Sequence, residues 1–230
     1  MDKNRTLSDT KRSFYQYHRR PINSVYRRVV EELIVEMHLL SVNVDFRPEP
    51  IYYLGVCESF RRFMEGYTPE KDKNSIFRAL CLSVEGNPDE YQQLSQALLN
   101  YAKDNPPSKV IDWLLNPTPF DGLASVAASW RQALDNPRFK YSRLFAIGLY
   151  TLMTASDEEL AKNQDKFVET IQPLADKLNL PVEKLKKDLD LYRSNLEKMK
   201  QMLGVMSDIL EAARKKRQEE SSAKNGANHQ

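Results

Sequence analysis

Hydrophobic side chains recur at intervals of three and four residues along almost the whole chain. The spacing of Leu94, Ala97, Leu98 and Tyr101 is typical, and it places apolar side chains on one face of an α-helix rather than of a strand. The same pattern predicts helices at residues 8–19, 22–43, 50–66, 69–85, 88–104, 107–115, 119–135, 138–155, 157–178 and 181–217. We therefore expect an all-α fold, a multi-helix bundle with a long C-terminal coiled-coil-like helix.

Polar capping residues mark the starts of several of these helices. Asn87 and Thr118 each precede a proline, and a first-turn proline costs no hydrogen bond because that N–H has no partner within the helix. Ser156 and Glu159 have the spacing of a capping box. From these signals we expect three parts: a helical bundle over residues 1–156, a helical hairpin over 157–217 and a disordered tail over 218–230.

The long C-terminal helix has an uninterrupted heptad pattern, in which apolar residues alternate in steps of three and four. These residues are Val182, Leu185, Leu189, Tyr192, Leu196, Met199, Leu203, Met206, Leu210 and Ala213. A helix over 181–217 would be about 55 Å long, more than an ordinary domain diameter. The preceding helix carries a partial match and could pair with it, although Pro173 is expected to kink that partner.

In the distal half of this helix, the apolar face is wider than a heptad pattern alone requires. Met202, Val205 and Ile209 lie beside the heptad residues, and methionine-rich faces adapt to several partners. We predict that residues 201–217 project from the bundle and bind a partner. The residues of this predicted partner-binding surface are Met202, Val205, Met206, Ile209, Arg214, Lys215, Lys216 and Arg217. The alternative is that the face packs entirely on the protein's own bundle.

Three glutamates and a histidine lie within ten residues, "VVEELIVEMH", of the helix predicted at 22–43. On a helical wheel, Glu31 and His38 fall opposite the apolar face that carries Leu33. Glu32 and Glu36 are one turn apart and are the only plausible ligand pair, but di-iron bundles need Glu-x-x-His pairs from two helices, and the sequence has none. We expect solvated, ion-paired carboxylates, with a metal site at Glu32 and Glu36 as the alternative.

Charge is unevenly distributed, although the net charge is only +2. Residues 1–28 contain eight basic and two acidic side chains, a local charge of +6. We favour a solvated helix face; the alternative function is peripheral binding of an anionic membrane surface or nucleic acid through this segment. Phe14, Tyr15 and Tyr17 could stack on bases, but such tyrosines more often pack on their own domain, so no nucleic acid is expected.

Other chemistry is sparse. Cys57 and Cys81 lie in apolar settings without C-x-x-C spacing and are expected to be buried free thiols. The longest uncharged apolar run, Leu144 to Met153, is too short for a membrane span and predicts a buried core helix. The N-terminus is too polar for a signal peptide. We predict no catalytic residue, no cofactor and no bound metal, and hence a protein that is not an enzyme. Because no apolar run is long enough to span a membrane, we also expect it to be soluble.

Four long segments are distinctive as strings: "SDTKRSFYQYHRRPINSVYRRVVEELIVEMHLLSVNVDF", "IYYLGVCESFRRFMEGYTPEKDKNSIFRALC", "FKYSRLFAIGLYTLM" and "DLDLYRSNLEKMKQ". They closely resemble the Thylakoid Formation family of photosystem II biogenesis proteins, in its cyanobacterial form. The resemblance implies a non-enzymatic, all-helical accessory factor for photosystem II biogenesis and repair. It also implies a cytoplasmic location, peripheral association with the thylakoid membrane, and membrane-bound FtsH protease complexes and the photosystem II assembly machinery as partners.

Overall fold

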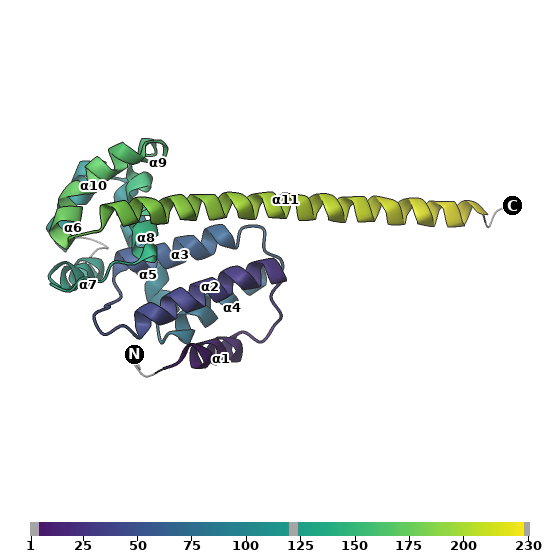
Figure 1. Ribbon diagram of the computed structural model, residues 1–230, viewed down its shortest axis with the longest axis horizontal. Helices are drawn as coiled ribbons and strands as arrows, with labels where there is room; N and C mark the ends of the chain where they lie inside the picture. The colour runs from purple at the N-terminus through teal and green to yellow at the C-terminus, as the bar shows by residue number, and fades with distance from the viewer. Residues whose placement is uncertain (1–4, 120–123, 228–230) are drawn as a thin grey trace. The chain divides into compact units, whose positions relative to one another are not determined.

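The computed structural model describes residues 5–119 and 124–227, and within these ranges the chain consists of α-helices and loops, as predicted (Figure 1). The helices are α1 (Leu7–Tyr17), α2 (Ser24–Ser41), α3 (Pro50–Phe63), α4 (Lys71–Ser83), α5 (Pro88–Lys103), α6 (Pro107–Leu115), α7 (Ala124–Leu134), α8 (Arg143–Ser156), α9 (Glu159–Lys162), α10 (Gln164–Leu178) and α11 (Val182–Ala227). The chain forms two compact units, residues 1–189 and 190–230, with the first turns of α11 in the first unit and the rest of α11 in the second.

Most helices begin where their capping residues predict. Asn87 accepts a hydrogen bond from the Asp89 backbone N–H at the start of α5, and Thr6 forms a reciprocal capping box with Asp9 at the start of α1. The predicted start at Thr118 borders residues 120–123, which lie outside the described ranges.

Three predicted boundaries were wrong. The helix expected from residue 138 begins at Arg143, because Ser142 accepts from the Phe145 N–H and caps it there. The helix expected over 157–178 divides in two, because Asn163 caps the start of α10. The last helix continues to Ala227 instead of ending at Arg217, through a segment that is rich in helix-forming Glu, Gln, Lys and Ala and has no proline.

The centre of the first unit is the contact between α3 and α8. Here the two backbones meet through glycines: a Cβ atom on Gly148 would lie 1.9 Å from the Ile51 carbonyl oxygen, and one on Gly55 would lie 1.7 Å from that of Leu144. Only glycine permits this approach. The apolar run predicted as a buried core helix is α8, and its buried residues confirm the prediction. By length and hydropathy, no helix in the described ranges qualifies as a membrane span.

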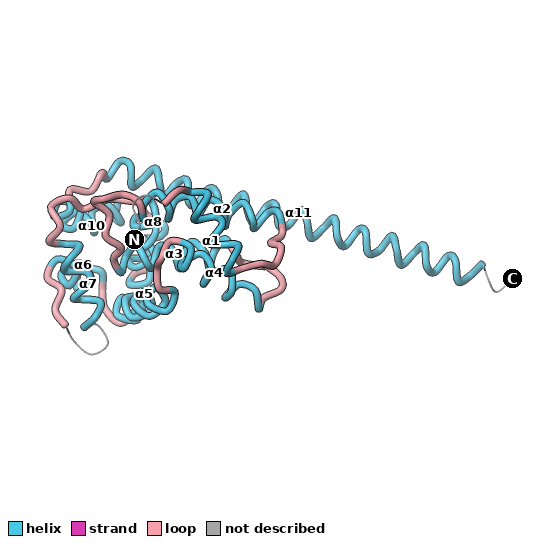
Figure 2. Tube along the Cα trace, turned by 90° about the horizontal axis from the view of Figure 1, so that it is seen from below, coloured by secondary structure: helices cyan, strands magenta, loops and turns pink. Residues whose placement is uncertain are grey.

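Helix α1 lies beside α2 and α4 (Figure 2). Its sequence leaves it with a narrow buried face, since Thr10 and Phe14 are its fully buried residues. The first turns of α11 belong to the same unit, where Leu185 and Leu189 are fully buried and the Tyr141 hydroxyl donates to Asp188 Oδ2 at 2.7 Å. The second unit, as far as it is described, is the remainder of α11.

Candidate functional site

The predicted partner-binding surface lies on the part of α11 that forms the second unit. Met202, Val205 and Ile209 expose 43%, 57% and 62% of their surface. Leu191 is 45% exposed and precedes Met202 by eleven residues, about three helical turns, so that all four side chains follow one stripe. The backbone of Met206 and of Arg214 to Arg217 is helical, but their side chains lie outside the described residues.

An exposed apolar stripe of this kind marks an interaction surface more often than scattered single residues do. The sequence dictates it directly: these four large apolar residues share one face of the helix, beside the face that carries the heptad residues, and most of the remaining positions are Lys, Glu, Gln, Ser or Asp. Gly204, between Met202 and Val205, has no neighbouring atom within 4 Å of a Cβ placed on it.

The glutamates of α2, considered above as metal ligands, are bound to arginines. Glu32 accepts from Arg28, four residues before it, at 3.2 Å, and Glu36 accepts from Arg143 Nη2 at 2.5 Å. Arg143 is the first residue of α8, 107 positions further along the chain, so no sequence pattern announces this pair. In the described part of the chain, no group of three or more His, Cys, Asp or Glu side chains is placed to hold a metal ion.

His38 corrects the helical-wheel interpretation of α2. It was expected on the solvated face, but it is only 5% exposed, and its Nδ1 lies 2.9 Å from Thr10 Oγ1. The reason is that α1 covers this side of α2, which a wheel drawn for one helix cannot show. Glu31, on the same side, pairs with Lys11 of α1 at 3.7 Å.

The basic N-terminal segment is used within the first unit. Arg5 lies 3.6 Å from Glu85 and Arg20 lies 2.7 Å from Asp72, whose side chain is 4% exposed. These cations are balanced by carboxylates from other segments, which reduces the field that the segment presents to an anionic surface. Because Asp72 is buried, loss of Arg20 would leave an uncompensated buried charge, so this pair attaches the segment to α4.

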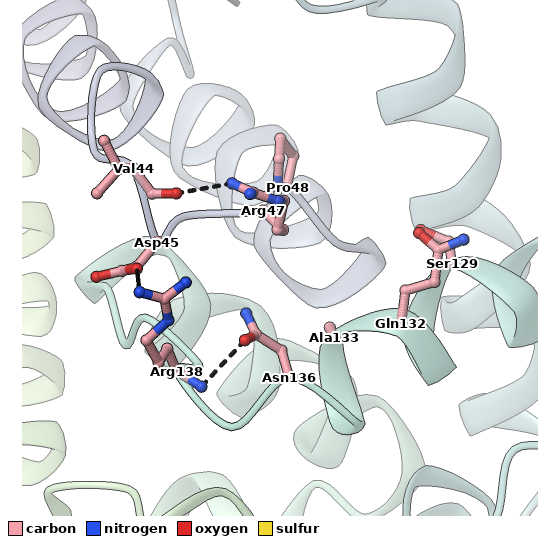
Figure 3. Close-up of a pocket in the computed structure, with 9 residues that line it drawn as sticks. All are labelled: Val44, Asp45, Arg47, Pro48, Ser129, Gln132, Ala133, Asn136 and Arg138. Atoms are coloured by element: carbon pink, nitrogen blue, oxygen red, sulfur yellow. Dashed lines mark hydrogen bonds and ion pairs between the residues drawn. The ribbon is translucent and has the colours of Figure 1, made fainter. Parts of the chain in front are cut away.

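A polar cavity of about 310 Å³ lies between the α2–α3 loop and the end of α7 (Figure 3). It is lined by Val44, Asp45, Arg47, Pro48, Ser129, Gln132, Ala133, Asn136 and Arg138. Its charged groups bind one another or the main chain: Arg138 pairs with Asp45 at 3.1 Å, and Arg47 Nη1 donates to the carbonyl of Val44 at 2.9 Å. Sequence analysis missed this cavity because its two walls lie about 85 residues apart.

Several buried titratable groups have pKa values shifted from the ordinary ones. Burial raises the pKa of the Cys57 thiol to about 11 and raises that of Cys81, which favours the protonated thiol at both positions at neutral pH. Both cysteines are free, with Cys81 buried as predicted and Cys57 half-buried. Burial also raises the pKa of Glu49 to about 8, against the opposing effect of the Ile51 and Tyr52 N–H groups that it caps. Glutamate is an unusual cap, which is why the sequence did not reveal it.

These features define an all-α protein with a 46-residue C-terminal helix and a stripe of exposed apolar side chains along it. Its sequence matches the profile of the thylakoid formation protein family over residues 6–221, and the chain belongs to that family.

Relatives from cyanobacteria are similar over nearly the full chain. Protein Thf1 of Crocosphaera subtropica is 56% identical, over 94% of this chain and 88% of its own length. Protein Thf1 of Rippkaea orientalis is 55% identical, over 95% and 93%. The solved structure of Psb29 is 43% identical and superimposes with a TM-score of 0.79, covering 93% of this chain and 98% of that one. These relatives confirm both the family and the all-α fold.

Proposed function

We propose that the protein is a non-enzymatic adaptor in photosystem II biogenesis and repair. In this role it binds membrane-bound FtsH protease complexes at the thylakoid membrane and supports their accumulation. The family name points to thylakoid formation, and the name of the structural relative, Psb29, points to photosystem II. Peripheral association on the cytoplasmic side of the membrane belongs to the same proposal.

The observation that carries this function is the apolar stripe of α11. A helix can bind a partner by placing such a stripe in a hydrophobic groove, with anchors spaced at three and four residues. Met202, Val205 and Ile209 have that spacing. Methionine adapts its shape to the groove, and the basic side chains at 214–217 would favour a groove with an acidic rim.

Charge substitution within the stripe tests the proposal. Val205→Glu and Ile209→Glu should each lower the recovery of FtsH complexes with the tagged protein from detergent-solubilised thylakoids by at least tenfold, about 1.4 kcal/mol of binding free energy. Lys200→Gln is the matched control, because it changes the net charge by the same one unit at an exposed position on the opposite side of the same helix. Circular dichroism should show equal helix content in all three variants. Recovery equal to that of the unmodified protein would remove α11 from the mechanism.

A further inference from the structure

Helix α1 is attached to the rest of the first unit mostly through polar groups. Phe14 is the one large apolar side chain that it buries completely, worth about 1.5–3 kcal/mol. The exposed pair of Lys11 with Glu31 adds little. Ion pairs that flank the helix, Arg5 with Glu85 and Arg20 with Asp72, also hold the segment. Two side-chain hydrogen bonds, one near the start of α1 and one at its end, complete the attachment, and both involve histidine.

The two histidines fasten α1 to different helices. Near the start of α1, Thr10 Oγ1 lies 2.9 Å from His38 Nδ1 of α2, and Thr10 is fully buried. At its end, His18 is the C-cap residue, is 1% exposed, and has its Nδ1 2.9 Å from Ser75 Oγ of α4. Both imidazole rings therefore lie in the interface that α1 forms.

A proton on either ring would place a charge in this largely buried interface. Burial lowers the pKa of both histidines from their ordinary value of 6.5. The charged groups that face His38 are Arg5, which opposes protonation, and Asp9, which favours it but already pairs with Arg12 at 3.6 Å. Those that face His18 are Asp72, which favours protonation but already pairs with Arg20 at 2.7 Å, and the Arg20 guanidinium, which opposes it; a hydrogen bond to the Arg20 backbone also favours protonation, but burial outweighs these effects.

We propose that α1 is an acid-sensitive strap, which is closed over α2 and α4 while His18 and His38 are neutral and detaches when they take up protons. Detachment would uncover the side of α2 that carries His38 and Ile34, which is one turn before it and is fully buried. The strap thus gives the first unit a second surface, available only under acidic conditions and separate from the stripe of α11.

The direction and size of the effect follow from proton linkage. In the detached state each histidine titrates near pH 6.5, whereas in the closed state it resists protonation. Closure is therefore fully stabilised above pH 6.5 and weakens as the pH falls below it. At pH 5 each histidine raises the equilibrium constant for detachment by up to about thirtyfold, because the pH is then about 1.5 units below the pKa of the detached form.

Hydrogen exchange on the full-length protein tests this proposal. With intrinsic rates corrected for pH, the protection factors of α1 amides should fall between pH 7.5 and pH 5 by up to about thirtyfold per histidine, while those of α3 and α8 hold. His18→Gln and His38→Gln should each remove one histidine's contribution to this fall in α1 protection. Glutamine can donate and accept a hydrogen bond but takes up no proton. His229→Gln changes the third histidine of the chain, outside the described residues, and should leave the response unchanged.

Three outcomes would overturn the proposal. One is constant α1 protection across this pH range, another is an equal loss of protection in every helix, and the third is a full response in both glutamine variants. Should a variant fail to fold, NMR titration of the imidazole C–H signals of the unmodified protein decides the question. The proposal requires two rings to titrate below the ring of His229, and fails if all three titrate together.

Discussion

Substituting one glycine at the crossing of α3 and α8 should have a large effect on stability. In Gly148→Ala the new methyl group would lie 1.9 Å from the Ile51 carbonyl oxygen, and 2.9 Å from the Gly55 nitrogen. Both obstacles are backbone atoms, so no side-chain rotation relieves the overlap. The two helices must move apart by roughly 1 Å before the contact becomes tolerable, and a gap of that size removes a quarter to a half of each dispersion contact across it.

The cost can be estimated from what lies around the crossing. On α8, Phe145, Leu149 and Leu152 are essentially fully buried, and on α3 so are Ile51 and Leu54. Partial loss of their packing places the change at or above the upper end of the range for overpacked cores, about 3 kcal/mol or more. For a chain of this size that corresponds to a decrease in Tm of roughly 6–12 °C.

Thermal unfolding followed by circular dichroism at 222 nm measures this change, and Gly204→Ala is the matched control. A Cβ on Gly204 meets nothing within 4 Å, so the same substitution there should stabilise the helix by about 0.5–1 kcal/mol. The two variants should therefore shift stability in opposite directions. A Gly148→Ala protein that melts within 2 °C of the unmodified one would show that α3 and α8 do not meet as described.

Three further predictions concern single side chains. Burial raises the pKa of Glu49 to about 8, so between about pH 4.5 and pH 8 the folded state holds a proton that the unfolded state has lost. The free energy of unfolding should therefore decline as the pH rises through this range. Glu49→Gln should reduce this pH dependence, measured by urea titration. Arg143→Ala should destabilise the fold by about 1–2 kcal/mol, and a double-mutant cycle with Glu36→Ala should show positive coupling, whereas additive effects would contradict the pair. Glu85 has a positive φ of 61°, so Glu85→Gly should raise the free energy of unfolding by about 0.5–1 kcal/mol in the same titrations, and a loss would argue against that backbone conformation.

Local sequence rules were sufficient for most of the helical architecture. Asn87 followed by a proline gave the start of α5, and the uncharged run from Leu144 gave α8, because caps and apolar periodicity act within a few residues. Boundaries failed where two signals competed, as at Asn163, which caps α10 inside a pattern that reads as one helix.

Features that depend on a second segment could not be predicted. His38 was assigned to solvent because nothing in α2 indicates that α1 covers it, and Glu36 gave no sign of its partner Arg143. The cavity in Figure 3 has the same origin, since its walls meet only in the fold. By contrast, the apolar stripe at Met202 and Val205 was predictable, because it is a property of one helix alone.

The close contact of α3 and α8 at Gly55 and Gly148 limits which substitutions this sequence can accept. Main-chain atoms of α3 and α8 touch each other directly, so the distance between these helices is set by the absence of two methyl groups rather than by the shapes of the surrounding apolar side chains. Neighbouring core positions can exchange one hydrophobic residue for another of similar volume and repack around a fixed axis. Saturation mutagenesis of this region should therefore find that Gly55 and Gly148 tolerate no substitution, whereas the neighbouring core positions accept other hydrophobic residues of similar volume.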